Sequence, residues 1–232
     1  MVVKQGLKRF RRFLANQVAI QLSEEIPSAF VKKVKLDLDI PVPLAYEDPN
    51  RHVPIFIERH ASAWLGGGTA LDIGCGANPR NQFGASKVYG CDIRGSEEGS
   101  VVGVDLFHDP IPFPDEFFDY VTAYDFIEHI PRVLTSRQGK TRFPFIEMMN
   151  EIHRVLKPGG LFFSQTPAYP SKQAFQDPTH VNITTEDTFP FYFCESNCND
   201  GSLYAKAYGF KGSFSLVTQE WCYCWLLSLL KK

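Results

Sequence analysis

Three short apolar runs, each with an aspartate near its end, constrain the fold of this chain most strongly. They are TALDIG (residues 69–74), KVYGCDI (87–93) and SVVGVDL (100–106), and FDYVTAY (118–124) and GLFFSQT (160–166) follow them. Runs that are apolar on both sides indicate strands buried on both faces. Because helix-like stretches such as FIEMMNEIHRVL (145–156) separate these runs, the pattern predicts a doubly wound α/β fold with a parallel sheet.

The C-terminal part of the chain follows another pattern. Two strand-like runs, GFKGSFSLV (209–217) and CYCWLLSLL (222–230), are separated only by TQEW. A parallel crossover needs a dozen or more residues, so these runs are expected to form an antiparallel pair at the sheet edge.

Length and composition narrow the class of protein. The chain has 232 residues, 44% of them hydrophobic and 22% charged, with a net charge of −2. These values fit one main domain, expected at residues 61–232, with residues 1–60 as a proline-broken helical or irregular extension packed on it. The charge gives no reason to expect stable nucleic-acid binding, and no apolar run is long enough for a transmembrane helix.

The N-terminal segment MVVKQGLKRFRRFLANQVAI is basic but has no continuous apolar core and no small-residue cleavage site. We therefore expect no signal peptide and a cytoplasmic protein. The segment favours an amphipathic helix packed on the domain, while peripheral contact with an anionic membrane surface stays open. None of the six cysteines has the spacing of a common zinc knuckle, so free thiols are expected.

The turn LDIGCGANPR (71–80) follows the first predicted strand. It offers bare backbone at Gly74 and Gly76, but Pro79 stands where a dinucleotide-binding turn has its third glycine. No Gly-Lys-Ser/Thr end follows, so a triphosphate loop is excluded. Asp72 at the strand tip suits an amine or cation, and Asp92, 20 residues later, suits the two hydroxyls of a ribose.

Asp105 ends the third run and could accept the amine of an adenine. The alternative is that these acids only cap the helices that follow their strands. Aspartates at three consecutive strand ends favour a ligand with an amine, a ribose and a base.

With these motifs the chain resembles the class I S-adenosylmethionine-dependent methyltransferases. The matching segments are LDIGCGANPR, the acid in YGCDIRG, VDLFHDPIPFPDEFFDYVTAYDFIEHI and EIHRVLKPGGLFFSQTP, over about residues 69–167. The resemblance implies a Rossmann-like sheet of seven strands, mostly parallel with an antiparallel last strand. It also implies S-adenosylmethionine as the cofactor.

By this resemblance, Asp72, Gly74 and Gly76 line the methionine end of the cofactor. Asp92 would hold the ribose hydroxyls, and Ile93 would pack on the adenine.

The resemblance further implies that Asp105 and Leu106 meet the edge of the adenine and that Tyr124 lies near the sulfonium. Asn78 and Pro79 depart from the family pattern, since many relatives carry another glycine in this turn.

Two histidines are candidates for catalysis. A base is needed only if the acceptor loses a proton as it attacks, as a sugar hydroxyl does. His180, in QDPTHVNITTEDTF after the fifth strand, is the first candidate, with a loop-bracing hydrogen bond as the alternative. His129 follows Glu128, and a role in orienting the next segment competes with a catalytic one.

The same region has a spacing compatible with a metal. Asp125, Glu128 and His129 stand at i, i+3 and i+4, as on one helical turn, and His180 could complete a set. Metal-dependent small-RNA 2′-O-methyltransferases use a comparable arrangement, with glutamate at the first position. Aspartate is shorter and no RNA-binding domain is visible, so the sequence-based prediction is that no metal is bound.

The acceptor is expected to meet residues 1–60, the insert PRVLTSRQGKTRFPF (131–145) and residues 167–208. The DPTHV segment resembles a loop of methyltransferases associated with bacterial surface-glycan synthesis, which makes a glycan or sugar hydroxyl the first expected acceptor. Alternative acceptors are a quinone, a lipid, another small molecule or a nucleic-acid terminus. A further alternative is that the chain is a partner protein that binds the cofactor without catalysing methyl transfer.

Overall fold

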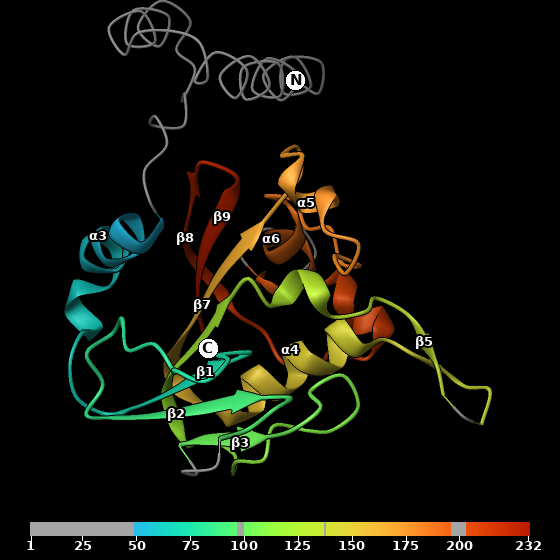
Figure 1. Cartoon of the computed structure of the whole chain (residues 1–232), viewed down its shortest axis with the longest axis horizontal. Coiled ribbons are helices and arrows are strands. Elements are labelled where there is room, and N and C mark those ends of the chain that lie inside the picture. Colours follow the sequence, from blue (N-terminus) through green and yellow to red (C-terminus); the bar gives the residue numbers. More distant parts are fainter. Residues whose placement is uncertain (1–48, 97–99, 137, 196–202) are drawn as a thin grey trace, which may run out of the picture.

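Strand β4 (Phe118–Tyr124) lies at the centre of the molecule, with every residue but one buried. The computed structural model describes residues 49–96, 100–136, 138–195 and 203–232 (Figure 1). Within that part, seven strands form one sheet in the order β3-β2-β1-β4-β7-β9-β8. Their bounds are β1 Thr69–Ile73, β2 Lys87–Asp92, β3 Val101–Gly103, β7 Leu156–Pro167, β8 Ser215–Cys222 and β9 Trp225–Lys231.

Strand direction confirms the predicted fold class. β1 pairs in parallel with β2 and β4, β2 with β3, and β4 with β7. β9 runs antiparallel to both of its neighbours, β7 and β8, so the last strand of the chain is antiparallel. The sheet is thus doubly wound, with its carboxyl ends gathered at one edge.

The remaining elements lie around this sheet. They are α3 (Pro49–Ala61), α4 (Pro144–Val155), α5 (Gln173–Gln176), α6 (Thr188–Phe193), the 3₁₀ turns η1 (Ser62–Trp64), η2 (Ile127–His129) and η4 (Tyr204–Tyr208), and the hairpin of β5 (Leu134–Thr135) and β6 (Thr141–Arg142). No helix in the described part is both long and apolar enough to span a bilayer.

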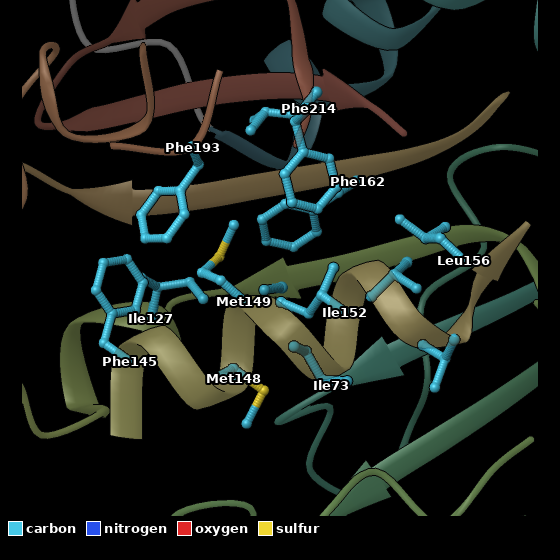
Figure 2. Close-up of a cluster of buried hydrophobic side chains, with 14 of the residues drawn as sticks. Ile73, Ile127, Phe145, Met148, Met149, Ile152, Leu156, Phe162, Phe193 and Phe214 are labelled. Carbon is cyan, nitrogen blue, oxygen red and sulfur yellow. The ribbon is translucent and has the colours of Figure 1, made fainter. Parts of the chain in front are cut away.

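Alternating side chains of the central strands bury two separate cores. One core packs α4 against the strands: Phe145, Met149 and Ile152 meet Phe162 and the aromatic residues of the C-terminal half (Figure 2). The other packs α3 on the opposite face (Figure 1), around Phe56 and Phe163. α3 belongs to the extension expected at residues 1–60, and the rest of that extension lies outside the described residues.

Helices connect fewer strands than the sequence pattern predicted. The β1–β2 and β3–β4 connections contain no α-helix, and in the described part only the β4–β7 crossover has one between parallel strands. Proline, glycine and asparagine break these connections. Aromatic side chains cover the sheet instead: Phe83 stacks on Tyr120 with centroids 4.6 Å apart, and Tyr89 contacts Phe113 and Phe117 edge-on.

The C-terminal hairpin is antiparallel as predicted, but its turn lies elsewhere. TQEW belongs to β8, and the turn is at Tyr223 and Cys224, where Tyr223 has a left-handed φ of 53°. Polar TQEW looks like a turn in sequence. Because β8 is the half-exposed edge strand, polar residues are accommodated there.

Candidate functional site

The glycine turn after β1 is tied to β2 through its backbone. Gly74 and Gly76 have φ of 66° and 64°, values that side-chain-bearing residues rarely adopt. The Gly74 N–H donates to the Cys91 carbonyl at 2.8 Å, and the Gly76 N–H donates to Asp92 Oδ2 at 3.0 Å. The turn therefore holds the Asp92 carboxylate beside bare backbone.

Asp72 lies beneath this turn. Its carboxylate is 1% exposed and accepts hydrogen bonds from Thr122 Oγ1 at 2.7 Å and from the Arg80 N–H at 2.8 Å. Burial raises the pKa of Asp72 to about 6. Both carboxylate oxygens are engaged within the protein, so Asp72 is positioned to brace the turn.

A cavity of about 540 Å³ opens at the carboxyl ends of β1, β2 and β3. This volume is in the range of small-molecule sites. The lining joins the glycine turn to the acceptor-side loop and consists of Gly74, Asp92, Ile93, Val104, Asp105, Leu106, Phe107, Phe126, His129, Pro131, Thr179 and Val181. Six residues singled out from the sequence thus meet in one cavity: Gly74, Asp92, Ile93, Asp105, Leu106 and His129.

Ile93 presents an exposed apolar side chain to this cavity. Its side chain is 69% exposed, although it follows a buried strand and lines the cavity. Leu106, in the connection between β3 and β4, is buried. Desolvating an exposed aliphatic side chain favours a flat apolar group such as a base.

Asp105 braces a turn and also lines the cavity. Its Oδ1 accepts the Phe107 N–H at 3.1 Å and its Oδ2 lies 3.0 Å from His108 Nδ1, so it braces a turn at residues 105–109. No helix follows it, which makes the capping alternative wrong in its helical form. The same carboxylate lines the cavity.

Tyr124 belongs to the core on the α3 face of the sheet and does not line this cavity. Its ring packs 5.4 Å from that of Phe163, and the Arg80 guanidinium lies 4.3 Å from its centroid. Its hydroxyl is buried without a hydrogen-bond partner in the described part, and burial raises the pKa of Tyr124 well above its ordinary value. Tyr124, Gly76 and Asp72 are absent from the lining of the 540 Å³ cavity.

The loop after β7 is fastened to η2 by its backbone. The Val181 and Asn182 N–H groups both donate to the Glu128 carbonyl at 2.9 Å, and Asn182 Nδ2 donates to the Ile127 carbonyl at 3.0 Å. Arg132 Nε donates to Asn182 Oδ1 at 2.7 Å. Arg132, in the insert expected to meet the acceptor, is therefore engaged within the protein.

These hydrogen bonds from Val181 and Asn182 to η2, which we call the Asn182 clamp, bring the two candidate histidines together. The rings of His129 and His180 meet edge-on, with centroids 4.9 Å apart and an interplanar angle of 77°. His129 lines the cavity, whereas His180 is not among its lining residues. The Glu128 side chain beside them is buried, and desolvation raises its pKa to about 8.

Asp125 does not share a helical turn with Glu128 and His129, so that expectation was wrong. It has a left-handed φ of 49°, and η2 begins only at Ile127. Its carboxylate accepts hydrogen bonds from Trp225 Nε1 at 2.5 Å and Gln165 Nε2 at 3.1 Å. The carboxylate is thereby held toward β7 and β9.

Asn182 and Thr166 are functional candidates that sequence reasoning missed. Asn182 is fully buried and ties the loop to η2, and Thr166 Oγ1 donates to Glu128 Oε2 at 2.6 Å. A buried asparagine beside the candidate histidine has no periodic pattern to mark it. Its proximity to His180 in DPTHVN was the available signal.

Comparison with known proteins places residues 55–199 in the family model described as "Methyltransferase domain". Two demethylmenaquinone methyltransferases are similar. That of Geobacillus sp. is 28% identical over 160 residues, covering 61% of this chain and 59% of its own, and that of Lysinibacillus sphaericus is 28% identical over 104 residues, covering 42% and 32%. The matches thus span less than two thirds of either relative.

Among solved structures, a SAM-dependent methyltransferase from Archaeoglobus fulgidus is similar, with 18% identity and a TM-score of 0.46. The similarity covers 78% of this chain and 94% of that one.

Proposed function

Since this chain belongs to the methyltransferase-domain family, whose cofactor is S-adenosylmethionine, we propose that it methylates a hydroxyl oxygen of a small-molecule or glycan acceptor. A sugar hydroxyl is the first candidate. The observation that carries the proposal is His129, an imidazole in the same cavity as the residues proposed to hold the cofactor.

The 540 Å³ cavity fits the cofactor by its chemistry. Asp92 offers a carboxylate to the ribose hydroxyls, and Gly74 allows close approach to the backbone. The exposed Ile93 and the buried Leu106 both offer apolar surface to the adenine. Asp105 would meet the adenine edge. Bound there, S-adenosylmethionine supplies a methyl carbon already activated by a positive sulfur.

We assign supporting roles to the other predicted cofactor residues. Asp72 braces the turn through Arg80 and Thr122, and Gly76 holds Asp92 through its N–H. Tyr124 would act through packing beneath the site, because its ring contacts Phe163 and Arg80.

The histidines beside the cavity favour a hydroxyl acceptor, because such an acceptor needs a group that assists the loss of its proton. A hydroxyl must lose its proton as the oxygen attacks the methyl carbon, and a neighbouring group must assist that loss. The His129–His180 pair is that group in our proposal. The apolar side chains of Val104, Phe126 and Val181 would exclude water and help align the acceptor.

A quinone is the second candidate acceptor, favoured by the similarity to demethylmenaquinone methyltransferases. Tyr169 and Phe175, which precede the histidine loop, are 44% and 57% exposed, with ring centroids 6.4 Å apart. Aromatic faces suit either a sugar ring or a planar quinone. The chemical distinction is that a quinone ring is methylated on carbon.

Asp92 provides a test of the cofactor site. Replacing Asp92 with Ala is expected to weaken S-adenosylmethionine binding by about 1.5–3 kcal/mol, because the ribose hydroxyls lose a charged acceptor. Calorimetry measures this change, and Asp115→Ala is the control, since Asp115 contacts Arg154 and not the cavity. Unchanged affinity in the Asp92 variant would remove Asp92 from the site.

The acceptor can be tested with isotope-labelled S-adenosylmethionine. The purified chain is incubated with fractionated glycan, quinone and small-metabolite pools, and mass spectrometry with NMR identifies the labelled product. We expect label in an O-methyl group of a sugar or another alcohol. A C-methylated quinone would select the second candidate, and cofactor binding without transfer to any pool would favour a non-catalytic role.

A further inference from the structure

Three side chains with metal-binding donor atoms converge next to the cofactor cavity. Glu128 and His129 come from η2, and His180 comes from the loop after α5. One donor atom of each lies within 4.8 Å of the other two. The hydrogen bonds between Asn182 and η2 hold these three side chains together. The set therefore differs from the one suggested by sequence spacing, which included Asp125.

The hydrogen bonds of His129 leave its Nε2 as an acceptor. Thr179 Oγ1 donates its only proton to Asp177 Oδ1 at 2.6 Å, so toward His129 Nδ1, 3.0 Å away, it can only accept. The proton of neutral His129 is then on Nδ1, and a lone pair remains on Nε2.

His180 reaches the same state by a different contact. Its Nδ1 lies 3.3 Å from the Ala174 carbonyl oxygen, which can only accept a hydrogen bond. The proton is again on Nδ1, and Nε2 carries a lone pair. Metal-ligating histidines typically donate their second N–H to an oxygen in this way.

Glu128 adds a buried and incompletely paired carboxylate. The residue is 1% exposed, and its Oε2 accepts a hydrogen bond from Thr166 Oγ1 at 2.6 Å. Its Oε1 has no hydrogen-bond partner in the described part of the chain. A buried carboxylate without a counter-charge is unfavourable, so this cluster requires a cation or a proton.

We propose that Glu128, His129 and His180 bind one divalent transition-metal ion, and that the ion holds the acceptor hydroxyl beside the cofactor. Two imidazoles and one carboxylate suit zinc or a similar ion, whereas magnesium prefers oxygen donors. Metal–ligand bonds of about 2.0–2.2 Å draw donors to about 3–4 Å apart, so small side-chain movements would complete the site. Three protein ligands leave a position open for the acceptor oxygen.

The role in methyl transfer rests on the function proposed above. With the ion bound, both histidine Nε2 lone pairs are on the metal, so the pair assists proton loss through the ion and not as a base. The ion lowers the pKa of the hydroxyl, and the hydroxyl proton passes to water. An oxygen lone pair forms the new C–O bond, and the electron pair of the broken C–S bond stays on sulfur. The products are the methyl ether, the neutral thioether and one released proton.

The site is tested with metal alone. The full chain is freed of metal with a chelator, titrated with Zn²⁺ or Mg²⁺ by calorimetry, and its metal content is measured. We expect one equivalent of Zn²⁺ and no comparable Mg²⁺ binding. His180→Gln and Glu128→Gln should each weaken Zn²⁺ binding by about 100-fold or more, and Thr179→Val by about 10–100-fold, because His129 loses its orienting partner.

His60→Gln is the matched control, because His60 Nε2 also contacts a carboxylate, that of Glu220 at 2.6 Å. It should bind Zn²⁺ like the unmodified chain. Absence of stoichiometric Zn²⁺ binding would overturn the proposal. So would His180→Gln and Thr179→Val variants that bind Zn²⁺ as tightly as the unmodified chain. Because the titration needs no acceptor, its failure is separate from a failure to find an O-methylated product.

Discussion

Replacing His180 with Gln is expected to lower the turnover number about 10²–10⁴-fold, with the affinity for S-adenosylmethionine nearly unchanged. Gln keeps a donor for the Ala174 carbonyl but has no imidazole lone pair. The loss is expected whether His180 takes the acceptor proton itself or binds a cation beside it. Steady-state kinetics on the identified acceptor, with calorimetry of cofactor binding, measures both quantities.

A melting curve separates catalysis from loop bracing for this variant. If His180 only fixes the loop at residues 177–183, the rate loss should be smaller and should come with a lower Tm. His60→Gln, on α3, is the control that keeps the same substitution away from the cavity lining. Full activity of His180→Gln would contradict both roles.

Gly74→Ala is expected to destabilise the fold by about 2–5 kcal/mol and to impair cofactor binding. A left-handed φ of 66° costs a non-glycine residue about 1–2 kcal/mol. The added Cβ would also stand 2.2 Å from Phe126 Cδ2, and relieving such overlap costs about 1–3 kcal/mol. Phe126 lines the cavity and lies against Phe107, with centroids 6.3 Å apart, so its displacement would alter the cavity.

Gly76→Ala is a matched control two residues away. Gly76 has nearly the same φ, 64°, but a Cβ there meets no atom within 4 Å. Gly76→Ala should therefore lose only the about 1–2 kcal/mol that a left-handed φ costs a non-glycine residue. Urea denaturation measures both losses of stability, and equal losses in the two variants would show that the Phe126 contact is not limiting.

Local patterns were sufficient to predict the sheet and part of the cavity. Runs ending at Asp92 and Asp105 predict parallel strands, and parallel strands end at one edge of the sheet. Gly74, Asp92 and Asp105 could therefore be placed together before any contact was known, and the structure brings them into one cavity lining.

Strand alternation, however, separates residues that look equivalent in the sequence. Asp72 and Tyr124 also stand at strand ends, but their side chains point to the α3 face, where Asp72 meets Thr122 and Tyr124 meets Phe163. The sequence predicts that these residues lie near strand ends. The face of the sheet on which each side chain lies depends on where the strand begins and ends.

The sequence by itself determined the α/β class, the antiparallel last strand and the position of the glycine turn after β1, because these follow from the periodicity and spacing of neighbouring residues. Only the tertiary structure decided which donors lie together. The left-handed backbone at Asp125 turns it toward Trp225, while the Asn182 clamp brings His180 to His129 and Glu128 from about 50 residues away. Such contacts depend on long-range hydrogen bonds, which no local pattern encodes.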